Sequence, residues 1–531
     1  MKKNNIVVFG PTNSGKTTLL GYITAKSMGK ERFESYINKK IIEMGNQYIE
    51  ERKLTYLFDT SVDEWSLVSG GPGTSMRKHF KSVEIEGLPV TVIDTPGTTN
   101  RWKNGYQGIY MGDIGIFVIE LKQLLPFTNY VPGSEEYDDF LHNWLAPLAL
   151  WNEYGRIERL IIAISKCDQY KFSRYYINRA ITQLNTIPYL ENVPIIPIGV
   201  NIRLVEGINI LQTDKNVYSS ESLSNKIIEY NKKIDNNASK QSDISVASID
   251  KLFKTTKDDQ SSALRIKVLK GQFSQGDNIM LVPVLYDNQL VKLMGTVRSL
   301  KDEGSQVIVD SLYAGDIGGI KFTRLFNERS RIPLKDITLT NTSMLFSGNC
   351  EDCLFGHILS LSIDSSSQVV RFITGKYIQI LWFGKTVLAR IISCKKEGDC
   401  FRLKIMNTNN NDNKNKLFYL PQNLDGSSVY TRFVIQYENQ FICTSFEGLQ
   451  VLTNDPHYAI LVSLNSDYRR LEGILSASVN CSIDYSANNN QTALLLRDIG
   501  KKKLVEILFS KEIRLTDILD VNVLPNDNEV S

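Results

Sequence analysis

The sequence has little that would place the chain in a membrane, in an oxidising compartment or on a nucleic acid. No apolar run in its 531 residues approaches the roughly 18 that a membrane-spanning helix needs. Residues 1–5 lead directly into an apolar segment, which predicts no signal peptide. The seven cysteines are scattered and odd in number, which indicates free thiols in a reducing cytoplasm. A net charge of +3 neither requires nor excludes a nucleic-acid partner.

The sequence does contain a phosphate-binding motif near its start. The apolar residues 7–9 precede the pattern G-x-x-x-x-G-K-T over residues 10–17, and a helix is predicted to begin there. Glycines let consecutive N–H groups point at phosphate oxygens, and the helix adds its positive N-terminal end. We expect Lys16 to reach the β- and γ-phosphates and the Thr17 hydroxyl to bind Mg²⁺. The residues predicted to contact the phosphates are Asn13, Ser14, Gly15, Lys16, Thr17 and Thr18.

A second motif, Asp-Thr-Pro-Gly at residues 94–97, follows two predicted strands at residues 83–86 and 90–93. A carboxylate at the carboxyl end of a parallel strand can bind Mg²⁺ through water, and Gly97 lets a backbone N–H approach the γ-phosphate. Thr74, about twenty residues before Asp94, is predicted to close over the same metal when the third phosphate is present.

A third motif, Ser-Lys-Cys-Asp at residues 165–168, follows an apolar segment and matches the guanine-binding pattern [NTS]-K-x-D. Asp168 is expected to accept both N–H groups on the Watson–Crick edge of guanine, a donor pair that adenine lacks. The Lys166 stem is expected to lie along the base plane. Ser165 stands where asparagine is commoner, so we expect a bond that fixes this loop to be lost or shortened.

The segment that follows the next predicted strand completes the base site. Gly199 and Val200 come directly after residues 195–198, where a backbone N–H is expected to meet the guanine oxygen. Repeated strand–helix units predict a mixed, mostly parallel sheet with helices on both faces.

In this order the motifs resemble the GTPases of the translation-factor class, and most closely elongation factor 1-alpha with its release-factor and ribosome-rescue relatives. Further segments carry the resemblance to about residue 452, at residues 43–45, 103–113, 244–253, 269–282 and 314–320. The resemblance implies GTP or GDP with Mg²⁺ as ligand, and GTP hydrolysis assisted by Lys16 and Gly97. It implies tRNA, a release-factor-like protein or the ribosome as partner. The lack of a long apolar run predicts no membrane partner.

Three departures from the family pattern bear on this hypothesis. Thr98 replaces the histidine that positions the attacking water, so Thr98 is not expected to activate water by itself. Residues 70–75 lack the arginine of the first switch, and Asn13 replaces an aspartate that helps to hold a monovalent cation, although an amide oxygen can also serve. We therefore expect slow or partner-dependent hydrolysis. His79, near the first switch, is the one histidine that merits testing as a substitute.

The predicted fold is multidomain. It comprises an α/β P-loop domain at residues 1–240, β-barrels at 241–333 and 334–452, and a C-terminal extension at 453–531. Apolar runs in the extension predict that it is folded, and its partner is unknown. Two alternatives to a translation factor stay open. One is a GTP-sensing regulatory or scaffold protein that no longer acts in translation, and the other is the GTPase subunit of a sulfate-activating enzyme.

Overall fold

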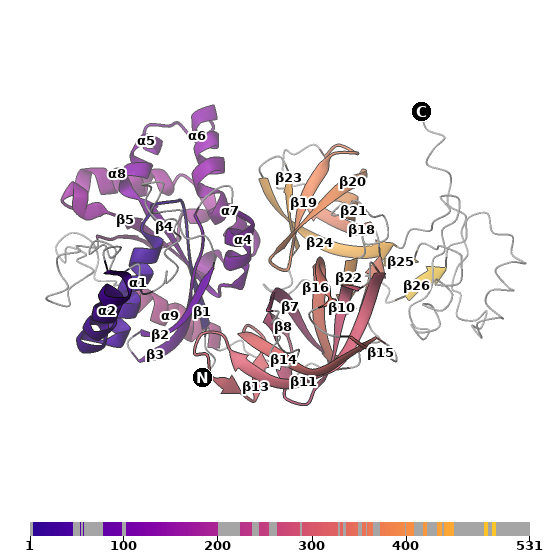
Figure 1. Cartoon of the computed structure of the whole chain (residues 1–531). Helices are drawn as coiled ribbons and strands as arrows, with labels where there is room; N and C mark the ends of the chain where they lie inside the picture. The colour runs from indigo at the N-terminus through magenta and orange to yellow at the C-terminus, as the bar shows by residue number, and fades with distance from the viewer. Residues whose placement is uncertain are drawn as a thin grey trace, which may run out of the picture. The chain divides into compact units, whose positions relative to one another are not determined.

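Figure 1 shows a computed structural model of the whole chain. The structure describes residues 4–45, 54, 57, 78–85, 87–97, 102–199, 223–235, 244–253, 263–286, 289–327, 330–332, 336–348, 353–356, 358–364, 372–398, 400–407, 418–421, 433–437, 440–450, 483–486 and 491–494. All structural statements below refer to these residues.

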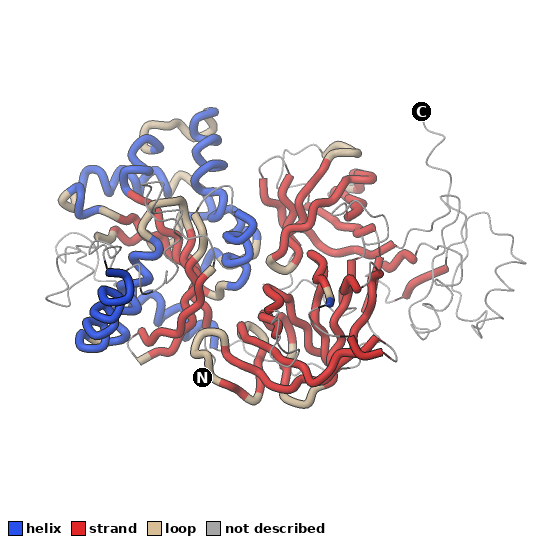
Figure 2. The backbone as a smooth tube through the Cα atoms, in the orientation of Figure 1, coloured by secondary structure: helices blue, strands red, loops and turns tan. Residues whose placement is uncertain are grey.

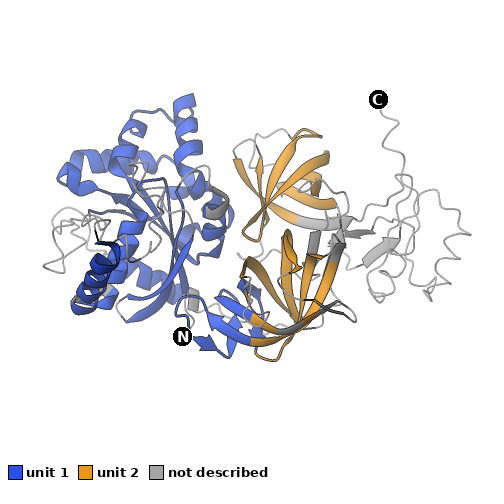
Figure 3. Cartoon of the chain, viewed as in Figure 1, with its two compact units in different colours: residues 1–241, 264–274, 299–320 blue, residues 242–263, 275–298, 321–531 orange. Residues whose placement is uncertain are grey.

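The chain forms two compact units, drawn in blue and orange in Figure 3. The first unit holds residues 1–241 together with 264–274 and 299–320. The second holds residues 242–263, 275–298 and 321–531. Figure 2 shows that the helices gather in the α/β part of the chain, whereas the barrels are built of strands.

The α/β part is built on a six-stranded sheet in the order β2-β3-β1-β4-β5-β6. All neighbours are parallel except β2 and β3, which form an antiparallel hairpin, so the predicted mixed and mostly parallel sheet is confirmed. The strands are β1 (Asn4–Phe9), β2 (His79–Ile85), β3 (Leu88–Asp94), β4 (Ile114–Glu120), β5 (Leu160–Ser165) and β6 (Ile195–Pro197).

Helices cover both faces of this sheet, as Figure 1 shows. Alternate residues of β1 point to opposite faces: Ile6 and Val8 join the cluster that packs under α1, α2 and α9, while Phe9 stacks on Trp151 of α7. The helices are α1 (Lys16–Met28), α2 (Lys30–Met44), α4 (Trp102–Met111), α5 (Leu121–Phe127), α6 (Glu135–Phe140), α7 (Ala146–Glu153), α8 (Arg174–Leu184) and α9 (Leu223–Asp235). Short turns add the π-helix Leu141–Leu145 and the 3₁₀ helices Ile157–Arg159, Cys167–Tyr170 and Pro188–Leu190.

The first barrel contains six strands closed into a ring by the pairing of β11 with β14. Its strands are β7 (Ile244–Phe253), β8 (Ala263–Lys270), β10 (Asn278–Tyr286), β11 (Gln289–Asp302), β14 (Ile317–Asn327) and β16 (Thr338–Gly348). The short strands β12 (Ile308–Val309) and β15 (Ser330–Ile332) extend its sheet, and β9 (Gln272–Ser274) pairs with β13 (Ser311–Tyr313). Because β16 belongs to this sheet, the sheet continues beyond residue 333, where we expected the first barrel to end.

The second barrel also has six strands and is closed by the pairing of β18 with β24. Its strands are β18 (Ile358–Asp364), β19 (Tyr377–Trp382), β20 (Lys385–Glu397), β21 (Cys400–Asn407), β23 (Phe433–Tyr437) and β24 (Gln440–Gln450). The pair β17 (Cys353–Gly356) and β22 (Phe418–Pro421) stands beside them as a separate sheet. In the expected C-terminal extension the described residues are β25 (Ile483–Ser486) and β26 (Gln491–Leu494).

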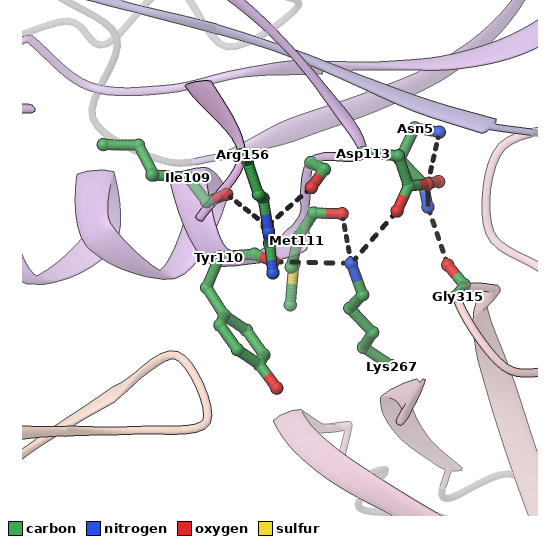
Figure 4. A network of polar contacts seen from close by, with 9 residues as sticks. Asn5, Ile109, Tyr110, Met111, Asp113, Arg156, Lys267 and Gly315 are labelled. Atoms are coloured by element: carbon green, nitrogen blue, oxygen red, sulfur yellow. Dashed lines mark hydrogen bonds and ion pairs between the residues drawn. The ribbon is translucent and has the colours of Figure 1, made fainter. Parts of the chain in front are cut away.

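A buried lysine joins helix α4 to the part of the first barrel that lies in the first unit (Figure 4). Lys267 of β8 has no exposed surface, and its Nζ donates to the carbonyl oxygen of Met111 at 2.6 Å. The same Nζ lies 3.8 Å from the Asp113 carboxylate, which is equally buried. Since carbonyl oxygens at a helix C-terminus carry partial negative charge, a cation at this position stabilises the end of α4.

Two further buried groups extend this network. The Asp113 carboxylate accepts hydrogen bonds from the backbone N–H and the side-chain amide of Asn5, at 2.9 and 2.8 Å. The Asn5 amide also donates to the Gly315 carbonyl at 2.7 Å. Arg156 donates to the carbonyls of Tyr110 and Gly112 at 2.9 and 2.7 Å. The C-terminal end of α4 is thus held by two buried cations.

None of the helices within the described residues combines the length and the apolar character that crossing a bilayer requires.

We predict that Lys267→Met destabilises the first unit, because it leaves the buried Asp113 carboxylate without its cation. Breaking a buried ion pair in this way costs about 3–5 kcal/mol in the free energy of unfolding. Chemical denaturation followed by intrinsic fluorescence measures the change. Lys301→Met, at an exposed lysine of the same unit, is the matched control and is expected to change stability by less than about 0.5 kcal/mol. Equal stability of the two variants would contradict the assignment.

Candidate functional site

The phosphate-binding motif forms a tight loop between β1 and α1, as the sequence predicts. Gly10 has φ 139°, and a Cβ added there would lie 2.1 Å from the Val118 carbonyl oxygen on β4. Gly15 has φ 89° and begins α1, with its carbonyl accepting from the backbone N–H of Leu19 at 2.9 Å. Only glycine fits at residue 10, because the loop lies directly against the neighbouring strand.

Lys16 folds back over this loop. Its Nζ donates to the Pro11 carbonyl at 2.5 Å, and only 6 % of the residue is exposed. Gly97 packs closely against the Lys16 ammonium: a Cβ on Gly97 would lie 2.5 Å from the Lys16 Nζ and 2.8 Å from the Gly10 carbonyl oxygen. Burial lowers the pKa of Lys16 to about 8, against the opposing effect of the Asp94 carboxylate. An anion bound beside Lys16 would raise this pKa again.

Two of the three residues expected to bind the metal, Thr17 and Asp94, meet beside Lys16. The Thr17 hydroxyl donates to the Asp94 carboxylate at 2.7 Å, and Asp94 has no exposed surface. Parallel pairing of β1 with β3 brings Asp94 opposite Val8, and antiparallel pairing of β2 with β3 brings His79 opposite Asp94. A hydroxyl and a carboxylate are hard oxygen donors of the kind that Mg²⁺ prefers, so the residues present fit this ion.

The predicted base-binding loop lies beside the phosphate loop. The Ser165 hydroxyl donates to the Ser14 carbonyl at 2.6 Å, across 151 residues of sequence. We expected a loop-fixing bond to be lost or shortened at this serine. A short bond is present instead of a loss, because β5 ends close enough to the loop for a hydroxyl to reach it.

Asp168 and Gly199 also come together. Asp168 is exposed, and a Cβ on Gly199 would lie 2.7 Å from the Asp168 Oδ1, so the Gly199 backbone packs directly against this carboxylate. The loop is held by the Cys167 backbone N–H, which donates to the Ile198 carbonyl at 3.1 Å. Burial raises the pKa of the Cys167 thiol to about 12, so this thiol is a packing group.

Not every predicted site residue can be placed. Thr74, Thr98 and Val200 lie outside the described residues. Asn13 is exposed in the phosphate loop with φ 62°, and Thr18 lies in the first turn of α1. Their roles stay predictions.

The structure adds two residues that sequence reasoning missed. Glu120, the last residue of β4, forms an ion pair of 2.9 Å with the Lys166 ammonium. Gln123 of α5 donates through its Nε2 to the Thr12 carbonyl at 3.2 Å, inside the phosphate loop. The sequence holds no recognisable signal for either contact, because a capping box is recognised by Ser, Thr, Asp or Asn at the N-cap and the N-cap here is a glutamate.

The fold and the two adjoining loops define a P-loop nucleotide-binding protein. The sequence matches the family described as "Elongation factor Tu GTP binding domain" over residues 1–290, more than half of the chain. The chain therefore belongs to this family, within the translation-factor GTPase superfamily. No curated protein sequence matches it.

Solved structures support the fold at low sequence identity. The Ski7 GTPase-like domain of S. cerevisiae, bound to GDP and inorganic phosphate, has a TM-score of 0.61 and 14 % identity, covering 83 % of this chain and 96 % of its own. Elongation factor SelB of Methanococcus maripaludis, in complex with GppNHp, has a TM-score of 0.54 and 14 % identity, covering 87 % and 84 %. The bacterial selenocysteine-specific elongation factor EF-Sec has a TM-score of 0.53 and 15 % identity, covering 90 % and 61 %.

The pKa of Lys16 predicts how binding of a nucleoside diphosphate depends on pH. Nucleotide binding raises the pKa of Lys16 from about 8, so Lys16 takes up a proton when the nucleotide binds. The affinity for the nucleotide therefore weakens as the pH rises through 8. Between pH 7 and 8.8 we expect GDP affinity to fall by about five- to tenfold. Calorimetry in two buffers of different ionisation enthalpy measures both the affinity and the proton uptake. A constant affinity, with no proton uptake at pH 8, would contradict the pKa assignment.

Proposed function

We propose that the chain is a GTP/GDP-dependent switch of the elongation factor 1-alpha-like class, which acts in translation or in ribosome-associated quality control in the cytoplasm. The observation that carries the proposal is the Ser165–Ser14 hydrogen bond of 2.6 Å. It joins a loop that carries a guanine-binding pattern to a loop that carries a triphosphate-binding pattern. One nucleotide can therefore span both loops.

Each loop has its own role in the proposed site. Lys16 binds the β- and γ-phosphates after leaving the Pro11 carbonyl, and the backbone N–H of Gly97 donates to the γ-phosphate. Asp168 accepts from guanine, with the Lys166 stem along the base and backbone donors from Gly199 and Val200 at the guanine oxygen. Ser14, Gly15 and Thr18 present their backbone N–H groups to the phosphates.

We assign Mg²⁺ to the Thr17 hydroxyl and, through water, to the Asp94 carboxylate, with Thr74 joining in the GTP state. The ion neutralises phosphate charge when it is bound. The 2.7 Å contact between the first two groups supports this assignment. Asn13, exposed at the outer edge of the loop, is the proposed ligand of a monovalent cation.

The nucleotide selectivity is tested by titration with GTP, GDP and ATP. We expect both guanine nucleotides to bind and ATP to bind at least about 100-fold more weakly, because adenine offers no donor pair to Asp168. Asp168→Asn is expected to lower GTP affinity by about 100-fold, since it removes the charge that both bonds use. Asp139→Asn, at an exposed aspartate of α6, is the matched control. Equal uptake of ATP and GTP, or of neither, would overturn the proposal.

The hydrolysis rate is expected to be low in the isolated protein, because Thr98 replaces a water-positioning histidine. Loss of such a group typically lowers the rate by about 10²–10⁴-fold. Single-turnover hydrolysis of GTP by the purified chain measures the rate, and Thr98→His is expected to raise it. Thr182→His, at an exposed threonine of α8, controls for the added imidazole. A rate in the native chain as fast as that of a stimulated translation factor would contradict slow hydrolysis.

The elongation-factor neighbours SelB and EF-Sec support a role on the ribosome, with tRNA or a release-factor-like protein as partner. Co-sedimentation with ribosomes in a non-hydrolysable GTP analogue separates this role from the alternatives. GTP binding without co-sedimentation would favour a regulatory or scaffold protein. Adenylyl-sulfate synthesis that depends on the chain would favour a sulfate-activating enzyme. The domain division proposed from the sequence leaves residues 453–531 for a further, unidentified partner.

A further inference from the structure

Glu120 stands between the two loops of the proposed nucleotide site. It is the last residue of β4, and its Oε2 accepts a hydrogen bond of 2.9 Å from the Lys166 Nζ. The Glu120 side chain is 11 % exposed and that of Lys166 is 32 % exposed. The carboxylate is therefore largely buried, and the ammonium lies nearer to solvent.

The same residue also connects to the phosphate loop. Glu120 and Gln123 form a capping box at the start of α5, in which the Gln123 Oε1 accepts the Glu120 backbone N–H at 3.2 Å. The Gln123 Nε2 then donates to the Thr12 carbonyl at 3.2 Å. A chain of contacts thus runs from the Lys166 ammonium through Glu120 and Gln123 to the phosphate loop. It connects the same two loops as the Ser165–Ser14 bond.

A role in fold stability alone explains this pair poorly. Ion pairs that stay accessible to solvent contribute little to the free energy of folding, because screening and side-chain ordering offset the attraction. A lysine side chain that is ordered before its ligand arrives, however, loses less entropy on binding. Lys166 already has its backbone in the left-handed region, at φ 56°. Both the backbone and the ammonium of this residue are therefore fixed.

We propose that Glu120 is a positioning residue for guanine nucleotides, acting through Lys166. It holds the Lys166 ammonium, so that the lysine stem is already ordered along the position of the base before the nucleotide binds. Together with Gln123 it connects the base-binding loop to the phosphate loop. This inference rests on the proposed function. Since the Glu120 carboxylate contacts Lys166 of the base-binding loop, Glu120 affects GTP and GDP equally and is indifferent to the γ-phosphate.

The test uses the full chain and the variant Glu120→Gln, which keeps an oxygen acceptor of the same shape but removes the charge that holds Lys166. Fluorescence titration with GTP and with GDP is expected to show a loss of affinity of about three- to tenfold for both nucleotides. The melting temperature without nucleotide is expected to stay unchanged. Glu158→Gln, at an exposed glutamate of the same unit, is the matched control and should bind as the native chain does.

A double-mutant cycle separates positioning from a general structural effect. In the Lys166→Ala background, Glu120→Gln is expected to have no further effect on affinity, because the group that it positions is gone. Unchanged affinity of Glu120→Gln in the native background, an effect confined to GTP, or full additivity with Lys166→Ala would each overturn the inference. If the native chain bound neither guanine nucleotide, the proposed function would fail with it. Tight binding by both the native chain and Glu120→Gln would reject only the role of Glu120.

Discussion

The site depends on one steric constraint, the contact of the phosphate loop with strand β4. A Cβ on Gly10 would lie 2.1 Å from the Val118 carbonyl oxygen, so the loop can occupy this position only because residue 10 has no side chain. This contact places the loop against the centre of the sheet. The Thr17 hydroxyl then meets Asp94, and the Lys16 ammonium lies beneath Gly97. Each of these contacts would be lost if the loop moved outward.

Polar contacts connect the two loops of the site. Ser165 bonds to the Ser14 carbonyl, and Gln123 bonds to the Thr12 carbonyl, so both side chains use backbone acceptors of the phosphate loop. A different set of buried cations, Lys267 and Arg156, holds the C-terminal end of α4. Both loops of the site lie at the carboxyl ends of the strands, which is where ligands bind in open sheets of this type.

Much of the fold could be predicted from local patterns. The strands β1, β4 and β5 are buried throughout and mostly apolar, because both faces of a central parallel strand are covered. Gly10 and Gly15 have the positive φ angles that a tight glycine-bounded loop allows. The position of β16 was not predictable, because no local pattern tells which of two successive barrels a strand completes. Whether the serine at residue 165 loses or keeps a loop-fixing bond could not be predicted either, because its partner, the Ser14 carbonyl, is 151 residues away in the sequence.

The sequence by itself determined the class of protein, because a phosphate loop requires particular residue types at fixed spacings and these stand next to one another in the chain. It also determined the order of the α/β part and the barrels. Only the tertiary structure decided which distant groups meet: Glu120 with Lys166, Gln123 with Thr12, and Lys267 with the end of α4. The reason is physical, since an ion pair or a hydrogen bond between two elements depends on how the sheet and the barrel bring them together. The residues that make such contacts carry no spacing pattern of their own.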